Sequence, residues 1–540
     1  MKKNSFMEGA VIATLGIIIV KFIGLLYVIP FNAIIGEQGG ALYGYAYNIY
    51  MLFLSISSAG FPFAISKITS EYNALGYKSA IKKTYKLATM IISIISIVIF
   101  LLLFIFAPQI GHLIIGNSTG GNTISDISFA IRMVSFAILV IPFLSVSKGF
   151  LQGHKYIKLT TDSQIIEQIV RVAIIVVGSY AALKIFHTDL KTAVGIAVSG
   201  AFFGGLVACI FLSYKIRKAK LLDHKEKDKE KISSKEIIRK IIGYSIPFIV
   251  VSLIYNLYNT VDMILVSRTM GDILHMPMKQ IESVIGVFTT WGVKLNNILL
   301  AVTTGLTTSL IPNIVSSYTK GDMKDVNQKF NKAIQCTILI IMPATIFLSL
   351  LVGPVWQLFY GNSSYGPIVY KVFVFTALFG GLYSIVANTL QGLSKYKLVI
   401  GCVFTGLLIN TVCDVPFMLI AYNLGYDVSH GAIIAAIFGY SMSSIIALII
   451  LNKKYGFSFA DTRNRIPSYI ITTVLFALVI VILKLVIPTN LNGRLVQIPI
   501  LALFGLISFG IYFGLNYFLG NLTNIFEIKK GRKNENRNSK

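Results

Sequence analysis

The sequence predicts an all-α polytopic protein that crosses a membrane about fourteen times. Three observations support this class. The 540 residues are 55% hydrophobic and only 13% charged, and soluble domains carry about twice that share of charge. The apolar residues form runs of about 18 or more, the length at which a helix spans a bilayer. Lysine and arginine are concentrated in alternate loops between these runs.

Each apolar run is read as a membrane helix. The runs do not alternate with a period of two, which argues against a transmembrane β-barrel. The first run is too long for a secretory signal peptide and has no small-residue cleavage site. The predicted spans are roughly 9–35, 43–66, 86–107, 127–151, 162–184, 192–214, 241–267, 281–317, 333–352, 369–392, 397–421, 431–452, 467–487 and 496–519.

The distribution of basic residues predicts the orientation. The termini and every second loop carry 37 of the 48 Lys and Arg residues, whereas the alternate loops carry 6. Cytoplasmic loops are enriched in these residues, so we expect a multi-pass plasma-membrane protein with both termini in the cytoplasm. The same placement accounts for the net charge of +26 without a nucleic-acid partner.

The two halves of the chain share landmarks in the same order. The tripeptide LQG ends the fourth span at 151–153 and the tenth at 390–392, and Lys-Tyr follows closely each time. Each half holds six spans, an even number, so the repeat is parallel, with a pseudo-twofold axis along the membrane normal. The predicted domains are a six-helix lobe (1–214), a basic cytoplasmic linker (215–240), a second six-helix lobe (241–452), two extra helices (453–520) and a polar cytoplasmic tail (521–540).

Two lysines lie deep inside predicted spans. Lys21 is near the middle of the first run, where a charge costs roughly 2.5–3.5 kcal/mol on insertion scales. Lys294 shares a polar stripe along the eighth span with Thr290 and Asn297. Two-lobed transporters bind substrate between their lobes and alternate access by rocking. We expect Lys21 and Lys294 on opposite walls of such a cleft, where two ammonium groups suit a phosphate-bearing substrate.

These polar positions also have structural explanations. Snorkelling would carry the Lys21 ammonium toward the headgroups, and hydrogen bonds between helices would explain a stripe of Thr and Asn. Asn48 and Ser55 share one face of the second span and are assigned to the same cleft. Glycine permits close helix approach and proline interrupts helical hydrogen bonds, so the predicted hinges are Gly24, Pro30 and Pro312.

Three other intramembrane charges are candidates for an ion or charge relay. Glu167 and Arg171 lie four residues apart in the fifth span, a spacing that allows an ion pair within one helix. The alternative is a direct role in moving substrate or protons. Asp262 in the seventh span has no opposite charge four residues away. It either binds a coupling cation or forms a structural pair.

Other conspicuous residues are given structural assignments. Four tyrosines at the end of the second span are interpreted as an aromatic belt at the membrane interface, and Asp414 is assigned to a kink beside Pro416. The sequence holds no Walker A, GxSxG or HExxH motif, and its four cysteines lack CxxC spacing. It therefore predicts no catalytic residue, no metal site and no cofactor. The four tyrosines are Tyr43, Tyr45, Tyr47 and Tyr50.

Several segments resemble a known family. The stretch IPFNAIIGEQGGALYGYAYNIY, the following SSAGFPFAISKITSEYNALG, and QIIEQIVRV at 164–172 are similar to Gram-positive lipid II flippases of the MurJ type. These belong to the polysaccharide-synthase branch of the MOP exporter superfamily, which also holds the stage V sporulation protein B group. The resemblance covers nearly the whole chain. It implies export of an undecaprenyl-diphosphate-linked peptidoglycan precursor during cell-wall biogenesis, with cell-wall synthesis enzymes as partners.

The resemblance also implies a site. Family members line the central cavity with basic residues of spans one, two and eight, and Lys21 and Lys294 occupy two such positions, with lysine in place of arginine. Other charged positions of Gram-negative members correspond here to uncharged residues, namely Tyr27, Tyr43, Leu54 and Ser55.

Three alternative functions are considered. One is a flippase for another polyprenyl-linked polysaccharide unit. The second is a cation-coupled multidrug antiporter, whose cationic substrates would favour acids in the cleft. The third is a membrane scaffold that transports nothing, which the polar stripe on the eighth span disfavours. The leading prediction is the lipid II flippase.

Overall fold

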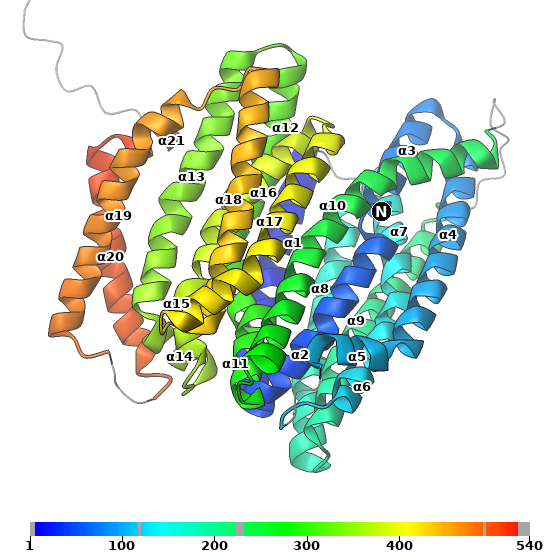
Figure 1. Ribbon diagram of the computed structural model, residues 1–540. Helices are drawn as coiled ribbons and strands as arrows, with labels where there is room; N and C mark the ends of the chain where they lie inside the picture. The colour runs from blue at the N-terminus through cyan, green and yellow to red at the C-terminus, as the bar shows by residue number, and fades with distance from the viewer. Residues whose placement is uncertain (1–5, 117–119, 223–231, 490–492, 527–540) are drawn as a thin grey trace, which may run out of the picture. The chain divides into compact units, whose positions relative to one another are not determined.

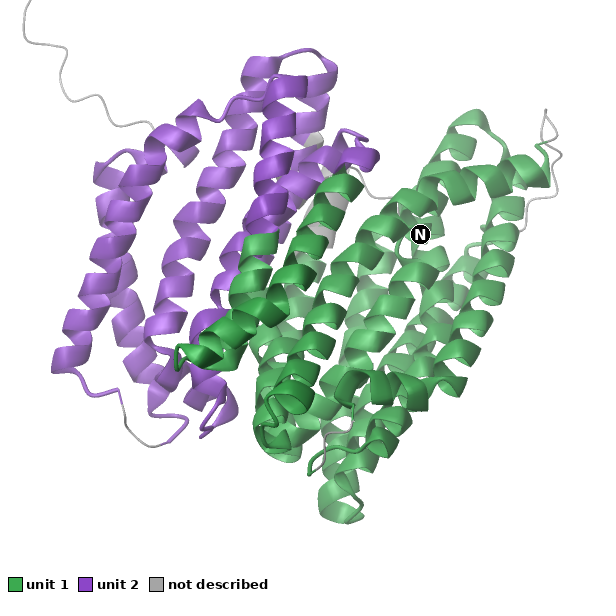
Figure 2. Ribbon diagram, in the orientation of Figure 1, with its two compact units in different colours: residues 1–298, 399–439 green, residues 299–398, 440–540 purple. Residues whose placement is uncertain are grey.

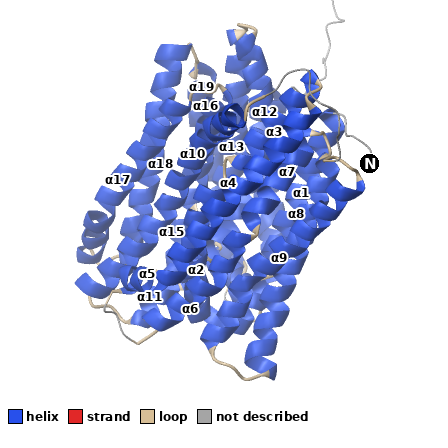
Figure 3. Cartoon of the chain, turned by 90° about the vertical axis from the view of Figure 1, so that its right-hand side faces the viewer, coloured by secondary structure: helices blue, strands red, loops and turns tan. Residues whose placement is uncertain are grey.

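The computed structural model describes residues 6–116, 120–222, 232–489 and 493–526, and every regular element in these ranges is a helix (Figures 1 and 3). Thirteen helices in this part are long and apolar enough to cross a membrane, and a shorter apolar helix covers Leu15–Leu26. The predicted all-α fold is therefore confirmed, with a count close to the expected fourteen.

The chain divides into two compact units (Figure 2). Unit 1 comprises Met1–Ile298 and Val399–Gly439, and unit 2 comprises Leu299–Leu398 and Tyr440–Lys540. The first predicted lobe lies wholly in unit 1, whereas the second predicted lobe is divided between the units. Three helices contribute residues to both units. They are α12 (Trp291–Thr319), α17 (Tyr396–Asn423) and α18 (Val428–Tyr455).

The first predicted span is interrupted. The helix α1 (Phe6–Leu26) ends before Tyr27, and α2 (Val28–Ser58) continues through the segment expected to be a loop. Pro30 has no N–H to donate to the preceding turn, which explains a break at this point. Gly36 adopts φ 66° and ψ −165° inside α2, a backbone conformation essentially restricted to glycine. The chain bends there while remaining largely helical.

Glycines bring the helices of unit 1 into close contact. An ideal Cβ on Gly16 of α1 would lie 2.1 Å from Thr161 Cγ2, and one on Gly204 of α9 would lie 2.5 Å from the Glu167 carbonyl oxygen. Small residues of this kind allow membrane helices to approach closely. The remaining unit 1 helices before α10 are α3 (Phe61–Leu75), α4 (Lys78–Ile105), α5 (Ala107–Ile115), α6 (Ile124–Ser135), η1 (Phe136–Leu139), α7 (Ile141–Gly153), α8 (Ile157–Ala173), η2 (Ile174–Gly178), η3 (Ala181–Ile185) and α9 (Leu190–Lys218).

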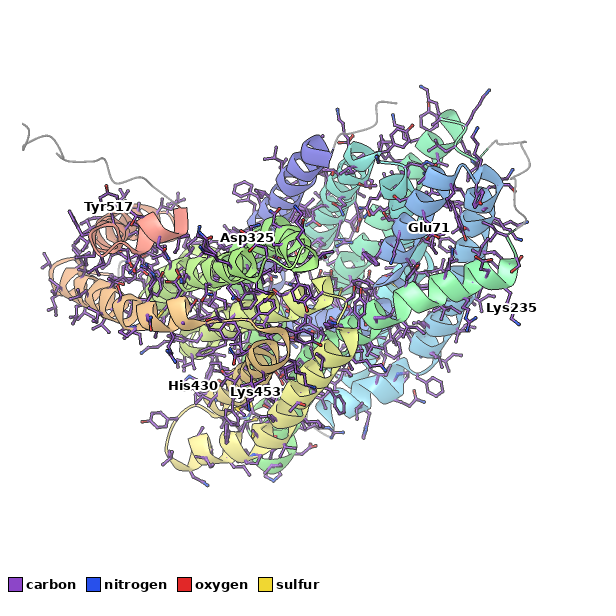
Figure 4. The ribbon with its side chains drawn as sticks, turned by 90° about the horizontal axis from the view of Figure 1, so that it is seen from above. Glu71, Lys235, Asp325, His430, Lys453 and Tyr517 are labelled. Atoms are coloured by element: carbon purple, nitrogen blue, oxygen red, sulfur yellow. The ribbon has the colours of Figure 1, made fainter. Side chains whose placement is uncertain are left out.

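The predicted linker is helical at both of its described ends. α9 extends to Lys218, and α10 (Ser234–Arg268) begins within the linker. The first turns of α10 lie against α3, where Lys240 Nζ is 2.8 Å from Glu71 Oε1; Figure 4 labels Glu71 and Lys235 on these two helices. The middle of the linker lies outside the described residues. After α10 come η4 (Thr269–Ile273) and α11 (Met278–Thr289).

Unit 2 contains the two helices that the sequence places outside the repeat. α19 (Ala460–Val486) is tied to α13 (Met323–Leu350) by buried polar side chains. Gln335 donates to Asp461 Oδ2 at 2.8 Å, and Asn331 donates to the Ser458 carbonyl at 2.7 Å. These polar groups satisfy one another, which favours a structural role. The other helices are α14 (Val352–Tyr360), α15 (Gly366–Phe373), α16 (Phe375–Gly392), α20 (Gln497–Phe518) and α21 (Asn521–Phe526).

Candidate functional site

Three charged side chains meet on α7 and α8 inside unit 1. Lys148 Nζ lies 2.9 Å from Glu167 Oε2, and Arg171 Nη2 lies 2.6 Å from Glu167 Oε1. The three side chains are between 14% and 18% exposed. The ion pair expected between Glu167 and Arg171 is present, and Lys148 of α7 joins it. Two bases share one acid, so the group carries a net charge of +1.

Tyrosines of α2 lie beside this charged group. Tyr43 and Tyr50 are 4% and 1% exposed. The rings of Tyr43 and Tyr47 stack with centroids 5.4 Å apart, and those of Tyr47 and Tyr50 are 5.5 Å apart. Arg171 lies within electrostatic range of all three hydroxyls. The prediction of an interfacial aromatic belt is therefore wrong for this group, whose hydroxyls and ring faces belong to the interior of the unit.

Close packing of α2 explains why these tyrosines are buried. An ideal Cβ on Gly40 would lie 2.3 Å from Trp291 Nε1, and one on Gly44 would lie 1.9 Å from Thr289 Oγ1. Only glycine leaves room for α11 and the start of α12 at this distance. Thr290, which is 2% exposed, donates to the Gly40 carbonyl at 2.9 Å and links the same elements.

Lys294 extends the charged group from a third helix. It lies one turn after Thr290, and its Nζ is 5.3 Å from the centroid of the Tyr27 ring, within range of a cation–π interaction. Lys294 also interacts electrostatically with Tyr47 and Arg171. We name the basic–tyrosine cluster as Lys148, Glu167, Arg171 and Lys294 together with Tyr27, Tyr43, Tyr47 and Tyr50. Its charges sum to +2.

The other predicted cleft residues do not join the basic–tyrosine cluster. Asn48 donates to the Gly44 carbonyl at 3.0 Å and Ser55 to the Leu52 carbonyl at 2.5 Å, so both side chains bond to their own helix. Asn297 is exposed on α12, and Lys21 is partly buried on α1. The structure thus brings Thr290 and Lys294 to the basic–tyrosine cluster and satisfies Asn48 and Ser55 elsewhere.

The predicted hinges differ in their surroundings. An ideal Cβ on Gly24 would lie 3.2 Å from Gln168 Nε2, so Gly24 serves a close approach of α1 to α8. Pro30 is the third residue of α2, just beyond the break at Tyr27. Pro312 falls within α12, and its side chain lies outside the described residues.

A second buried charged group lies on α10 and α17. Asp262 is 9% exposed and Asp414 is 0% exposed. Asn410 Nδ2 donates to Asp262 Oδ1. The Asp262 and Asp414 carboxyl groups lie close enough to interact with one another directly. We name Asp262, Asn410 and Asp414 the acidic cluster; carboxylate and amide oxygens of this kind are ligands for hard cations.

The acidic cluster was only partly anticipated from the sequence. Asp262 was a candidate, whereas Asp414 was assigned to a kink. In the structure α17 continues through Pro416, and Asp414 is buried beside Asp262. The overlooked signal is that Asn410 and Asp414 are four residues apart within an apolar run, a spacing that places both on one helix face.

Comparison with known proteins agrees with this architecture. A model of the family described as polysaccharide biosynthesis protein matches residues 6–317. The lipid II flippase MurJ of Bacillus subtilis (strain 168) is 30% identical over 535 residues, which cover 97% of this chain and 97% of that protein.

Solved structures share the fold. A lipid II flippase MurJ in an inward closed conformation matches with a TM-score of 0.62 at 16% identity, over 94% of this chain and 99% of that chain. An inward-facing multidrug resistance MATE family transporter of the MOP superfamily matches with a TM-score of 0.60 at 15% identity, over 83% and 95%. The family model covers more than half of the chain, and the MurJ relative is 30% identical over nearly all of it. This chain therefore belongs to the polysaccharide biosynthesis protein family.

Proposed function

We propose that this protein is a flippase that moves lipid II, a polyprenyl-diphosphate-linked peptidoglycan precursor, from the inner to the outer leaflet of the plasma membrane. The basic–tyrosine cluster carries this proposal. A net charge of +2 inside a membrane-spanning unit is unfavourable unless an anion compensates it. A diphosphate diester supplies two negative charges. The similarity to the lipid II flippase of Bacillus subtilis supports the same substrate.

The headgroup and the lipid tail have different requirements. The sugar–diphosphate headgroup enters from the cytoplasm, where Lys21 and Lys294 offset its charge. Tyrosine hydroxyls and ring faces suit the sugars, because an aromatic ring combines an apolar surface with a polar tip. The polyprenyl tail stays in the hydrocarbon of the bilayer. Bending at Gly24, Pro30 and Pro312 accompanies the rocking that exposes the headgroup outside.

No covalent bond changes in this process, so the protein acts as a transporter and not as an enzyme. An inside-negative membrane potential favours outward movement of an anion by about 2.3 kcal/mol per charge at 100 mV. A cation gradient is a second source of free energy for transport, and the acidic cluster is the place where such a cation would bind, between Asp262 and Asp414. We infer that this cation couples its own gradient to the conformational change.

The test is a flipping measurement with full-length protein in liposomes containing labelled lipid II. We expect wild type to move lipid II faster than other polyprenyl-linked sugars. Replacing both lysines (Lys21→Ala with Lys294→Ala) should lower the rate at least about tenfold, since charge-assisted contacts to phosphate are lost. Lys184→Ala, which removes an exposed lysine of η3, is the matched control.

Two outcomes would contradict the proposal. If the double lysine variant moved lipid II at the wild-type rate, the site assignment would fail. If wild type moved an organic cation or another polyprenyl lipid but not lipid II, the substrate assignment would fail.

A further inference from the structure

We propose that Glu167 is an exchangeable internal counter-ion: the diphosphate of the substrate displaces it from Arg171, and Glu167 then remains paired with Lys148. This inference rests on the proposed function and deepens it. It assigns substrate binding to Arg171 on α8, in addition to the lysines of α1 and α12, and it specifies which contact breaks when the anion arrives.

The geometry of the acid allows such an exchange. Each carboxylate oxygen of Glu167 serves a different base, with Oε2 2.9 Å from Lys148 Nζ and Oε1 2.6 Å from Arg171 Nη2. One contact can therefore break while the other persists. After the exchange Glu167 and Lys148 form a neutral pair, and Arg171 is compensated by the ligand.

Arg171 has donors available for a phosphate. A guanidinium carries five N–H groups in a planar fork that matches phosphate oxygens. One hydrogen bond of Arg171, to Glu167, is recorded among the described residues, and its buried Nε has no partner in that part of the chain. The unused side of the fork is the part that a diphosphate would occupy.

The surrounding charges favour a dianion over a neutral ligand. Within the basic–tyrosine cluster Glu167 opposes three bases, which leaves +2. Arg171 and Lys294 repel one another electrostatically, and an anion between them would replace that repulsion by two attractions. Anion binding would therefore stabilise the arrangement in which the start of α12 lies against α2 and α8.

A purely structural ion cluster is the competing explanation, and charge-changing variants separate the two. Arg171→Gln lowers the net charge of the cluster by one. Glu167→Gln raises it by one while leaving every base in place, and the double variant restores the wild-type sum. A purely structural cluster predicts weaker diphosphate binding in all three variants. Displacement of Glu167 by the diphosphate instead predicts tighter binding in Glu167→Gln and weaker binding in Arg171→Gln.

The experiment measures binding of inorganic pyrophosphate and of undecaprenyl diphosphate to full-length protein in nanodiscs. We expect Glu167→Gln to bind both about tenfold more tightly and Arg171→Gln about tenfold more weakly, because each gains or loses one charge-assisted contact. The double variant should lie within threefold of wild type, on the order expected for compensating charges. Arg132→Gln is the control, since Arg132 on α6 donates to the Phe104 carbonyl and has no part in the cluster.

The inference is overturned if Glu167→Gln weakens pyrophosphate binding, or if the three variants bind pyrophosphate with equal affinity. It is also overturned if chloride binds as tightly as pyrophosphate and its affinity changes in the same way across the variants. Lipid II flipping by wild type is read separately. If pyrophosphate binding follows the expected order but lipid II is not moved, the anion site stands and the proposed function fails. If lipid II is moved without that order, only the counter-ion exchange fails.

Discussion

The basic–tyrosine cluster and the acidic cluster are both buried in unit 1, yet they differ in sign and in access. The charged side chains of Lys148, Glu167 and Arg171 remain 14–18% exposed and are already paired. Asp414 is 0% exposed and Asp262 is 9% exposed, and among the described residues no salt bridge joins either to a base. The first arrangement suits a large anion that must enter and leave. The second suits a small cation or a proton.

Under the proposed function, this difference predicts separate roles within one transport cycle. If the two clusters served only to neutralise charge in the membrane, direct pairing of the acids with the surplus bases would be more favourable. Their separation onto α7, α8 and α12 in one case, and α10 and α17 in the other, leaves each able to bind a ligand of opposite sign. The predictions below test that separation.

The largest effect is expected from neutralising the acidic cluster. Asp262→Asn with Asp414→Asn removes both carboxylates at nearly constant volume, so cation-stimulated flipping should fall at least about tenfold because the oxygen ligands lose their charge. Pyrophosphate binding at the basic–tyrosine cluster should stay within about twofold, as expected for independent sites. Flipping in liposomes with sodium, choline or a proton gradient provides the measurement.

The matched control is Asp189→Asn. Asp189 is the exposed N-cap of α9 and accepts a hydrogen bond from Thr192 N–H at 2.9 Å, and asparagine is an equally good N-cap. Unchanged cation dependence in the Asp262 and Asp414 variant would remove the acidic cluster from the transport cycle.

A smaller effect is expected from disturbing the packing of α2 against the start of α12, which carries Lys294 of the basic–tyrosine cluster. In Gly40→Ala the new Cβ meets Trp291 at 2.3 Å, so α2 and α12 must separate. Overpacking of this kind lowers the free energy of unfolding by about 1–3 kcal/mol. Thermal unfolding in nanodiscs measures this change, and pyrophosphate binding should weaken with it because Lys294 moves.

Gly243→Ala on α10 is the control for that substitution. Nothing lies within 4 Å of its ideal Cβ, and alanine stabilises a helix interior relative to glycine by roughly 0.5–1 kcal/mol. A Gly40→Ala protein as stable as the Gly243→Ala protein would contradict the close packing of α2.

The smallest effect is expected at the tyrosine hydroxyls. Tyr47→Phe keeps the ring stacked on Tyr43 and beside Tyr50 but removes one hydroxyl, which is worth about 0.5–1.5 kcal/mol when it bonds a ligand. We expect lipid II headgroup binding to weaken about threefold. Tyr180→Phe, at a tyrosine that is 51% exposed, should change nothing. A loss of tenfold or more in Tyr47→Phe would give the tyrosines a larger share of the binding free energy than the bases.

Local patterns were sufficient for part of the site. Glu167 and Arg171 lie four residues apart on one helix, and that spacing alone predicts their ion pair. Lys148 is 19 residues from Glu167 and Asn410 is 148 residues from Asp262, so no local period connects them. The tyrosines of α2 were misassigned for a related reason: an aromatic group at the end of a span fits both an interfacial belt and a buried core.

The sequence by itself determined the class of this protein. The length of each apolar run and the placement of Lys and Arg are local properties, and they determine which segments cross the bilayer and which loops stay in the cytoplasm. It also determined that Lys21 is a costly charge inside the membrane and that Lys294 belongs to a polar stripe along its helix. Only the tertiary structure decided which groups surround Lys294. Burial of the tyrosines and the sharing of Glu167 between two bases depend on how closely α2, α8, α9 and α12 approach, and glycines such as Gly40 and Gly204 set those distances.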